Sequence, residues 1–405
     1  MTITMDPGAA ALLEALHRAG HKAYLVGGCV RDSLAGRIPH DWDICTSALP
    51  RQVLDLFGEK QCIPTGLQHG TVTVKHQGGL YEVTTFRVEG VYSDGRHPDH
   101  VDFVADVRED LARRDFTINA MAYNREEGLI DPFGGREDLL VRHRVRAVGD
   151  PVRRFEEDGL RILRLCRFGA KEELELDPAT ARAAMAECRR LACVSAERIW
   201  QELYKLLAAP HPARWMLPEI VGQILPWLDC AGQPARYEAS LRVVDALQPD
   251  PLTRLAALLA PAGPEAAGQA LARLKCSGAQ TKEVKTLVQE SGLAPDGVSP
   301  RRAVRHLLAR LEPDTVRRLL ALRQAQTGQA GFAAMTQALD ALLAEKACCR
   351  VSQLAVNGRD LMDLGVLPGP AVGKLLAAAL DQVLNENIPN ERAALLGWLK
   401  ENKTI

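Results

Sequence analysis

Hydrophobic and polar residues follow two different patterns along the 405-residue chain. In the first 145 residues or so, helical spacing is mixed with short alternating runs, such as residues 71–75 and 81–86, which predict strands. From about residue 151 the alternation disappears, and Ala-, Leu- and Arg-rich segments with helical spacing follow one another. We therefore expect an α+β head with a mixed sheet, followed by an all-helical remainder.

Several elements of the head can be placed individually. An opening amphipathic helix precedes a short buried strand over residues 23–26. A second strand is expected to carry residues 41–44. A helix over residues 50–57 follows, and either Thr46 or Ser47 is its expected N-cap.

The composition is that of an ordinary globular protein, with 47% apolar and 25% charged residues. No apolar run approaches the roughly 18 residues that cross a bilayer, and the N-terminus lacks the order of a signal peptide. The ten cysteines include no C-x-x-C pair, so we expect neither zinc nor disulfides. Most should be small buried hydrophobes, such as Cys29, Cys45 and Cys166. We expect a cytoplasmic protein without a membrane segment.

A formal net charge of −1 gives the chain no global positive field, so a polyanion would have to bind local patches. Two stretches are rich in arginine, and solvated helix faces are the alternative explanation for each. The first arginine cluster is Arg142, Arg144, Arg146, Arg153, Arg154, Arg161, Arg164 and Arg167. The second arginine cluster is Arg301, Arg302, Arg305, Arg310, Arg317, Arg318 and Arg323.

Candidate chemistry begins with a glycine pair that precedes a pair of carboxylates. Gly27 and Gly28 follow the predicted first strand, where a tight turn lets backbone N–H groups approach a phosphate. Asp41 and Asp43 are two apart on the predicted second strand, so they project to one side and present hard oxygen ligands to a cation. Asp-x-Asp alone is common on surface strands. With the upstream glycine turn it favours a metal-dependent nucleotidyl transferase.

Six ordered segments then support a resemblance. They are LVGGCVRDSLAGRIPHDWDICTSALP (residues 25–50), GLQHGTVTV (66–74), YEVTTFR (81–87), EDLARRDFTINAMAYN (109–124), DPFGGREDL (131–139) and RRFEEDGLRILRLCRF (153–168). Together they resemble the successive motifs of bacterial class II tRNA nucleotidyltransferases, the CCA-adding enzymes, a group that also includes bacterial poly(A) polymerases. The resemblance implies a polymerase β-like nucleotidyltransferase head over residues 1–147, a helical neck that recognises the base over 148–209, and a helical body and tail that bind tRNA over 210–405.

The resemblance also implies roles for individual residues. Asp41 and Asp43 would be catalytic and would hold Mg²⁺ ions that activate the tRNA 3′-hydroxyl and neutralise the leaving pyrophosphate. Arg113-Arg114-Asp115 resembles the motif that recognises the ribose, where a carboxylate can bond a 2′-hydroxyl. Helix-end charge is the alternative for the two arginines. The implied substrate-binding residues are Gly28, Arg31, Arg114, Asp115, Asn119, Asp158, Arg161, Arg164 and Arg167.

Asp158 and Arg161 are the most informative of these residues. On one helix they are three apart and share a face, so an intrahelical salt bridge is the simpler explanation. The resemblance instead makes them a protein template. Cytosine and adenine each present an amino group beside a ring-nitrogen acceptor, which suits a carboxylate and a guanidinium, whereas uracil and guanine present the reverse pattern.

Other segments bear on how complete the activity is. The polar segment 89–100 resembles the family's flexible loop and favours full CCA addition over CC-only addition. Glu82 is a candidate third acidic residue near the metals, although a polar strand position explains it equally. Residues 195–198 resemble the last family motif, which is expected to brace the nucleotide-binding helices. No His-Asp pair follows residues 255–259, so we expect no phosphohydrolase activity.

We therefore predict an enzyme that adds or repairs the 3′-terminal CCA of tRNA from CTP and ATP without a nucleic-acid template. Its expected partner is the acceptor and T arm of tRNA, with no obligatory protein partner. The alternatives are a poly(A) polymerase, and a CC-only or A-only tRNA nucleotidyltransferase. A noncatalytic RNA-binding protein is the alternative from a different class.

Overall fold

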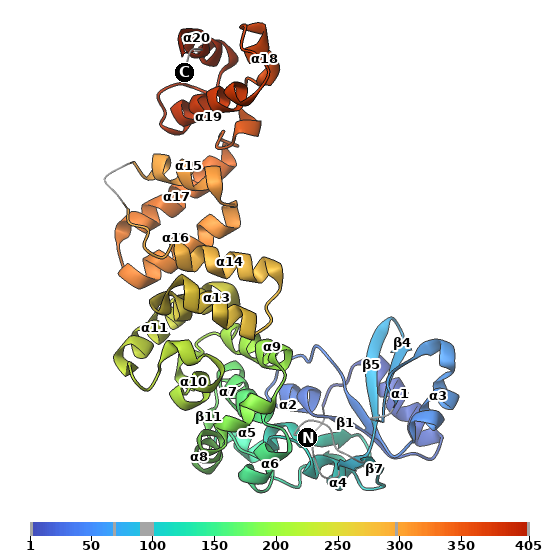
Figure 1. The fold of residues 1–405 in the computed structure, drawn as a ribbon. Helices are drawn as coiled ribbons and strands as arrows, with labels where there is room; N and C mark the ends of the chain where they lie inside the picture. The colour runs from blue at the N-terminus through green and yellow to red at the C-terminus, as the bar shows by residue number, and fades with distance from the viewer. Residues whose placement is uncertain (1–2, 68–69, 90–100, 296–298, 403–405) are drawn as a thin grey trace. The chain divides into compact units, whose positions relative to one another are not determined.

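The computed structural model describes residues 3–67, 70–89, 101–295 and 299–402 (Figure 1). The chain divides into two compact units. Unit 1 comprises Met1–Pro234 together with Arg273–Lys275, and unit 2 comprises Ala235–Ala272 together with Cys276–Ile405. Unit 1 contains a mixed sheet and helices, and the described part of unit 2 contains helices without strands, so the predicted α+β architecture is confirmed. The division into head, neck, and body with tail stays a prediction.

A seven-stranded sheet forms the centre of the first part of unit 1. Strands β2 and β5 are parallel and all other neighbours are antiparallel, so the sheet is mixed. Its core includes Tyr24, Phe86 and Leu111, each at most 1% exposed. In spatial order the strands are β3 (Cys62–Gly66), β4 (Thr71–His76), β5 (Gly79–Thr85), β2 (Ile44–Thr46), β1 (Ala23–Val26), β8 (Ala122–Asn124) and β9 (Gly128–Ile130).

The first three helices form close to where the sequence predicts them. Helix α1 (Pro7–Arg18) begins with Asp6 as its N-cap, and α2 (Gly28–Leu34) and α3 (Pro50–Phe57) follow β1 and β2. The predicted N-cap of α3 is wrong, because Leu49 occupies that position. The hydroxyl of Thr46 donates to the Lys22 carbonyl instead, and that of Ser47 accepts from the Lys22 N–H group.

The remaining elements of unit 1 are mostly helical. Helices α7 and α9 pack against each other through fully buried leucines such as Leu163 and Leu203. The helices are α4 (Val107–Ala112), α5 (Gly135–Leu140), α6 (Pro151–Glu157), α7 (Leu160–Glu172), α8 (Pro178–Ala186), α9 (Ala196–Leu207) and α10 (Pro218–Ile224). Two short ladders add β6 (Arg87–Glu89) with β7 (Val101–Phe103), and β10 (Arg144–Val145) with β11 (Glu175–Leu176).

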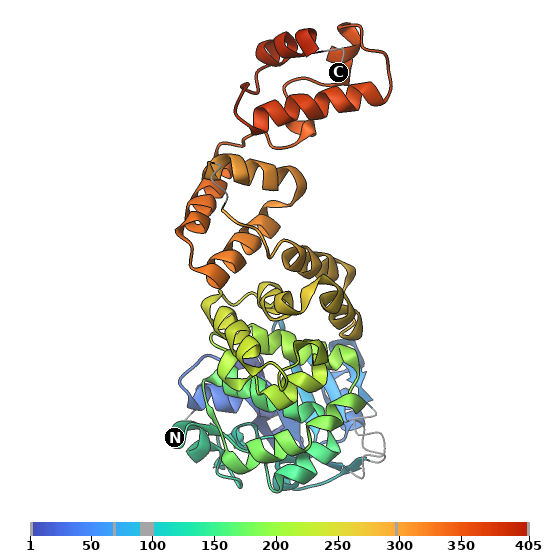
Figure 2. The same ribbon diagram turned by 60° about the vertical axis from the view of Figure 1, so that its left-hand side comes forward.

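Unit 2 is built from short helices, drawn from yellow to red in Figure 2. They bury leucines where they pack in pairs, as α16 and α17 do. These helices are α11 (Pro234–Ala246), α12 (Pro251–Leu259), α13 (Gly263–Arg273), α14 (Gly278–Gln289), α15 (Pro300–Arg310), α16 (Pro313–Thr327), α17 (Ala330–Ala344), α18 (Gly358–Asp363), α19 (Pro370–Leu384) and α20 (Arg392–Asn402). Throughout the part of the chain that the structure describes, no helix combines the length and apolarity needed to span a membrane.

Candidate functional site

The turn between β1 and α2 is the first feature of the site. Gly27 has φ 76° and ψ −125°, a backbone conformation that strains any residue with a Cβ atom. A Cβ atom here would lie 3.1 Å from Nη1 of Arg114. The turn thus brings a guanidinium close to the start of α2, where the first N–H groups have no partner within the helix. Such a turn is suited to a phosphate.

The two predicted catalytic carboxylates lie next to this turn. Asp41 and Asp43 precede β2, so the prediction that both lie on the strand is wrong. The strand begins at Ile44 because its ladder with β1 begins there, with Leu25 opposite. The carbonyl of Asp43 nevertheless accepts a hydrogen bond of 3.0 Å from the Val26 N–H group. The sheet therefore fixes the backbone of Asp43 beside the glycine turn.

A third carboxylate, that of Glu82, adds negative charge near this pair. The parallel register makes Asp43 and Glu82 neighbours, one residue before the first pair of the β2–β5 ladder. Burial raises the pKa of Asp43 to about 6; the charges of Glu82 and Asp41 add to the rise, and Arg114 opposes it. Clustered negative charge of this kind favours a bound cation. Among the described residues, no three His, Cys, Asp or Glu side chains form a ready-made metal site.

Arg114 is held from its other side by a buried carboxylate. Asp110 on α4 is fully buried, and its oxygens accept from Arg113 at 2.8 Å and from Arg114 at 3.3 Å. Burial alone would raise the pKa of Asp110, but the charges of Arg114 and Arg113 outweigh it and hold the pKa below its usual value. Asp110 therefore positions Arg114 between the glycine turn and the catalytic carboxylates.

Asp115 is a second buried carboxylate with guanidinium and amide partners. One oxygen accepts from the Phe116 N–H group at 2.8 Å and from the Asn119 amide at 3.3 Å, and the other accepts from Arg164 at 2.8 Å. Burial raises its pKa, but the charges of Arg164 and Arg161 and these hydrogen bonds outweigh it and lower the pKa to about 2. Arg164 supplies two nitrogens to that second oxygen, so all four acceptor positions are occupied.

Arg31 connects α2 to the helices that follow the sheet. Arg31 is 4% exposed, and its guanidinium donates to the side-chain oxygen of Asn119 at 2.7 Å and to Asp32 at 2.9 Å. Nη2 of Arg31 also lies 3.3 Å from Oε1 of its third side-chain partner, Glu172, at the end of α7. Arg31 is therefore fixed between Asn119 and α7, and most of its donors are already used.

Asp158 and Arg161 do not lie on one helix, contrary to the prediction. Helix α6 ends at Glu157, Asp158 is extended with φ −147° and ψ 107°, and α7 begins at Leu160. The Asp158 carboxylate accepts from the Leu160 N–H group at 3.0 Å and from Arg198 at 2.6 Å. Arg161 donates to the carboxylate of Glu157 instead. The simple salt bridge between Asp158 and Arg161 is therefore absent.

Three predicted substrate-binding arginines meet around one aromatic ring. The guanidinium carbons of Arg167, Arg164 and Arg31 lie 3.9, 5.3 and 5.4 Å from the ring centroid of Phe168. Arg167 also donates to Glu202 on α9, which is 6% exposed. Cations attracted to the ring face and to a buried carboxylate keep a fixed position. The Phe168 ring thus has three guanidinium groups around it, one from α2 and two from α7.

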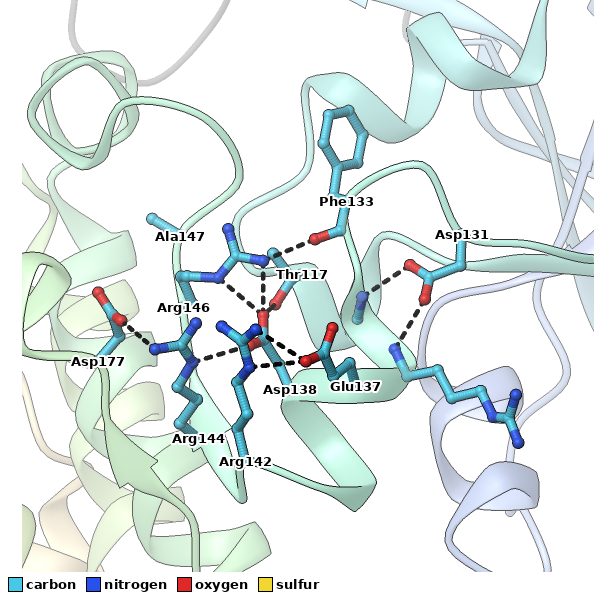
Figure 3. A network of polar contacts seen from close by, with 12 residues as sticks. Thr117, Asp131, Phe133, Glu137, Asp138, Arg142, Arg144, Arg146, Ala147 and Asp177 are labelled. Atoms are coloured by element: carbon cyan, nitrogen blue, oxygen red, sulfur yellow. Dashed lines mark hydrogen bonds and ion pairs between the residues drawn. The ribbon is translucent and has the colours of Figure 1, made fainter.

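A separate polar network supports the segment that carries Asp115 and Asn119. Asp138 on α5 is 1% exposed and accepts from the Thr117 hydroxyl, from Arg144 and from Arg146, each at 2.8 Å (Figure 3). Arg144 continues to Asp177 at 2.9 Å. Because Thr117 lies between Asp115 and Asn119, this network fixes the backbone between them.

Comparison with known proteins identifies the family. Residues 23–145 match the Poly A polymerase head domain, residues 173–217 match the probable RNA and SrmB-binding site of polymerase A, and residues 253–399 match a putative tRNA nucleotidyltransferase domain 2. A CCA-adding enzyme of Limosilactobacillus fermentum is 35% identical over 401 residues, which cover 95% of this chain and 94% of that protein. The chain belongs to the family of CCA-adding enzymes.

Further relatives match this chain over nearly its whole length. A CCA-adding enzyme of Geobacillus stearothermophilus is 36% identical, with 97% of this chain and 96% of that protein covered. The crystal structure of the Bacillus stearothermophilus CCA-adding enzyme in complex with CTP has a TM-score of 0.80 at 33% identity, covering 99% of this chain and 98% of that one. A Thermotoga maritima CCA-adding enzyme complexed with tRNA shares the fold, with a TM-score of 0.70 at 21% identity.

Family membership defines the class of chemistry. The chain is an enzyme, a tRNA nucleotidyltransferase that adds CCA without a nucleic-acid template, and the poly(A) polymerase alternative is not favoured. Nucleotidyl transfer in this family depends on metal ions. The two carboxylates next to the glycine turn have the donor chemistry for such ions, since hard cations prefer carboxylate oxygens.

The arginine clusters of this CCA-adding family member are largely neutralised inside their own units. Each arginine of the first cluster has a carboxylate within 4.0 Å. In the second cluster, Arg301, Arg305, Arg310, Arg317 and Arg318 also have carboxylate partners, and Arg323 donates to the Leu293 carbonyl. Ion pairing is therefore common in both clusters, while some members, such as Arg142 and Arg153, keep side chains that are 48% and 79% exposed.

Sequence reasoning missed the carboxylates that hold these arginines. Asp110, Asp138, Glu172 and Glu202 are at most 7% exposed at their side chains, yet each reads as an ordinary surface acid in the sequence. Asp110 stands out in the sequence only as a charge directly before the predicted ribose motif, although its position three and four residues before Arg113 and Arg114 could have indicated the ion pairs. Most of the predicted specificity loop, residues 90–100, lies outside the described residues.

Proposed function

We propose that this chain adds or repairs the 3′-terminal CCA of tRNA from CTP and ATP, with release of pyrophosphate. Asp41 and Asp43 would hold Mg²⁺, and Glu82 would strengthen the negative potential there. When bound, the metal ions activate the 3′-hydroxyl and neutralise charge on the leaving pyrophosphate. The observation that carries this proposal is the position of Arg114: its Nη1 lies 3.1 Å from where a Cβ atom on Gly27 would be, and its charge opposes the rise in the pKa of Asp43.

The chain's own residues then bind and orient the nucleotide. Gly28 and the start of α2 receive the triphosphate. Arg114 adds positive charge next to it. Asp115 and Asn119 bind the ribose. A 2′-hydroxyl could take the place of the Asn119 amide, which donates to Asp115 at 3.3 Å, and would donate an equivalent hydrogen bond.

Base selection is assigned to the junction of α6 and α7. Asp158 accepts the exocyclic amino group of cytosine or adenine, and Arg161 donates to the adjacent ring nitrogen. Arg164 and Arg167 fix this junction through Asp115, Glu202 and Phe168. The tRNA substrate is bound through its acceptor and T arm, and the compartment that suits tRNA maturation is the cytoplasm.

The first experiment supplies purified protein and Mg²⁺ with tRNA transcripts that end before CCA, after C, and after CC. Each labelled nucleotide is offered in turn. Addition of C, C and a single A, followed by termination, is the expected result. A-only or CC-only addition would mean that this chain performs part of the task, and long A tracts on any RNA would contradict the proposal.

Removal of the catalytic carboxylates tests the metal assignment. The Asp41→Ala and Asp43→Ala substitutions should lower incorporation at least about 10³-fold, which corresponds to about 4 kcal/mol of transition-state stabilisation. Binding of tRNA should largely persist, as measured by filter binding. Asp55→Ala removes an exposed carboxylate on α3 and serves as the control. Persistent incorporation by both single variants would mean that the metals bind elsewhere.

A further inference from the structure

A pocket of about 880 Å³ borders the catalytic carboxylates, and none of the groups assigned to the incoming nucleotide lines it. It lies within unit 1, where the end of α2, the segment that leads to Asp41, residues 3–6 and the tip of the β4–β5 hairpin meet. Asp41 is itself part of the wall. The volume lies in the range of about 300–1,000 Å³ that is usual for small-molecule sites. The pocket can therefore hold a nucleotide-sized group next to the proposed metal site.

The strand order of the sheet places this pocket opposite the glycine turn. Strand β2, which follows the metal carboxylates, lies between β1 and β5. The glycine turn follows β1, so the triphosphate is assigned to the β1 side. Leu80, which lines the pocket, and Glu82 belong to β5, on the other side. In an in-line displacement the attacking and leaving oxygens lie on opposite sides of the phosphorus. The pocket therefore lies on the side from which the attacking 3′-hydroxyl has to come.

Exposed apolar side chains are concentrated at this pocket. Ile38 is 89% exposed and Leu80 is 65% exposed, and both line the pocket together with Trp42. Among the large apolar residues that the structure describes, only Val141 and Leu367 besides Ile38 are more exposed than Leu80. Unstacked bases of single-stranded RNA pack on such surfaces whatever their sequence. This tolerance suits an RNA end whose last base changes as nucleotides are added.

Polar groups with unused hydrogen-bonding capacity line the same pocket. The Ser33 hydroxyl oxygen is buried and has no hydrogen-bond partner within the described ranges. Nη2 of Arg37 donates to Asp32 at 2.9 Å and to the carboxylate of Glu172. The Nε and Nη1 groups of Arg37 have no acceptor in the described part of the chain. The ion pairs thus fix Arg37 and leave N–H groups that suit a phosphate oxygen.

We propose that this pocket, lined by Ser33, Arg37, Ile38, Trp42 and Leu80, receives the single-stranded 3′ end of the growing tRNA. We name it the acceptor-end pocket. Its apolar residues contact the last base, and Arg37 and Ser33 bind the sugar–phosphate backbone, so that the terminal 3′-hydroxyl is held at the metal site. This inference rests on the proposed function, since it assigns a place to the RNA substrate of the same reaction.

The first test places a charge on the apolar wall with Ile38→Asp and Leu80→Asp. Both side chains are exposed, so the variants should fold, which thermal unfolding checks. Values of kcat and KM are measured with CTP on tRNA ending after C and with ATP on tRNA ending after CC. We expect the KM for tRNA to rise about tenfold or more, because a carboxylate repels RNA and removes the packing surface. The KM for CTP and ATP should change less than about twofold.

Matched variants separate the pocket from general effects of a surface charge. Leu56→Asp alters an exposed leucine of α3 that does not line the pocket, and it should leave every constant unchanged. Ile38→Ala and Leu80→Ala remove the apolar surface without adding charge, and they decide the outcome if an aspartate variant does not fold.

A shortened tRNA separates the acceptor end from the rest of the tRNA. Filter binding compares tRNA ending after CC with the same tRNA trimmed to the last base pair of its acceptor stem. Ile38→Asp should weaken binding of the first about tenfold and leave binding of the second unchanged. Ser33→Ala should weaken binding of the first about two- to fivefold without lowering the melting temperature, because it removes a buried hydroxyl that has no partner.

The possible failures are distinguishable. An unchanged KM for tRNA in folded Ile38→Asp and Leu80→Asp would overturn the acceptor-end pocket and leave the metal assignment intact. Equal losses of affinity for full-length and trimmed tRNA would also overturn it, since the trimmed end cannot reach the pocket. A higher KM for CTP and ATP alone would assign the pocket to the incoming nucleotide instead. Failure of the unchanged chain to add C or A would overturn the proposed function itself.

Discussion

Five buried carboxylates of unit 1 form ion pairs with arginines. Four of them have side chains at most 7% exposed, namely Asp110, Asp138, Glu172 and Glu202, and the fifth, Asp115, is 8% exposed. Each carboxylate binds at least one arginine that belongs to the proposed nucleotide site or to the polar network that supports it. Arginine keeps its charge when buried, so a buried arginine needs such a partner. At the scale of single residues, the site is therefore a set of paired charges with few unpaired donors left for the substrate.

The Asp115–Arg164 pair makes stability depend on pH. The folded pKa of Asp115 is about 2, below the ordinary value of 3.8. Its contribution is therefore present above about pH 4 and is lost as the pH falls through about 2, which corresponds to about 2 kcal/mol. Asp115→Asn should lower the free energy of unfolding by at least that amount at pH 6, and the difference from the unchanged chain should shrink near pH 2.

Denaturant unfolding at several pH values measures this effect. Asp340→Asn is a matched control, because Asp340 pairs with Arg317 at an exposed position, where an ion pair contributes at most about 1 kcal/mol. A difference between Asp115→Asn and the unchanged chain that did not vary between pH 6 and pH 2 would contradict the assignment.

At the scale of elements, short turns and helix junctions position the site more than long helices do. The junction at Asp158 interrupts α6 and α7, and the turn at Gly27 begins α2. The alternating and helical patterns predicted these elements well: the β1 strand and α3 match residue for residue. The break at Asp158 was not predicted, because Glu157 through Arg161 have ordinary helical spacing, whereas in the structure Asp158 is extended.

Gly27→Ala tests the role of the glycine turn. The substitution forces alanine into a strained conformation, at a cost of about 1–3 kcal/mol, and its Cβ atom would lie 3.1 Å from Arg114. We expect a lower melting temperature and a higher KM for both CTP and ATP. Gly36→Ala is the control: Gly36 has φ 73° with no atom within 4 Å, so it should cost stability without raising KM. Equal KM changes in both variants would show that strain alone is responsible.

At the scale of the whole molecule, most described arginines of the two clusters are paired with carboxylates. The sequence shows fifteen arginines in two clusters, eight and seven. It can indicate local counter-ions such as Glu157 for Arg161, but it cannot show those that come from segments far along the chain. Arg164 pairs with Asp115 and Arg318 with Asp250. Recognition of tRNA therefore relies on cations outside these pairs or on opening some of the pairs.

The salt dependence of tRNA binding distinguishes these two cases. If the pairs stay closed, their arginines neutralise no phosphates, and the affinity should fall less than about 10³-fold between about 50 and about 200 mM salt. Titrations of labelled tRNA at several salt concentrations measure the slope. A steeper slope would indicate that arginines exchange their carboxylates for phosphates on binding.

The polar network around Asp138 has a consequence for synthesis of the protein. All seven strands of the sheet are present once the chain reaches Ile130, but the network closes only with Asp177, and Arg167 gains its carboxylate only with Glu202. Chains emerge from the ribosome N-terminus first. A chain released before Glu202 would therefore form its sheet yet lack a finished nucleotide pocket, so truncated products would not consume CTP or ATP.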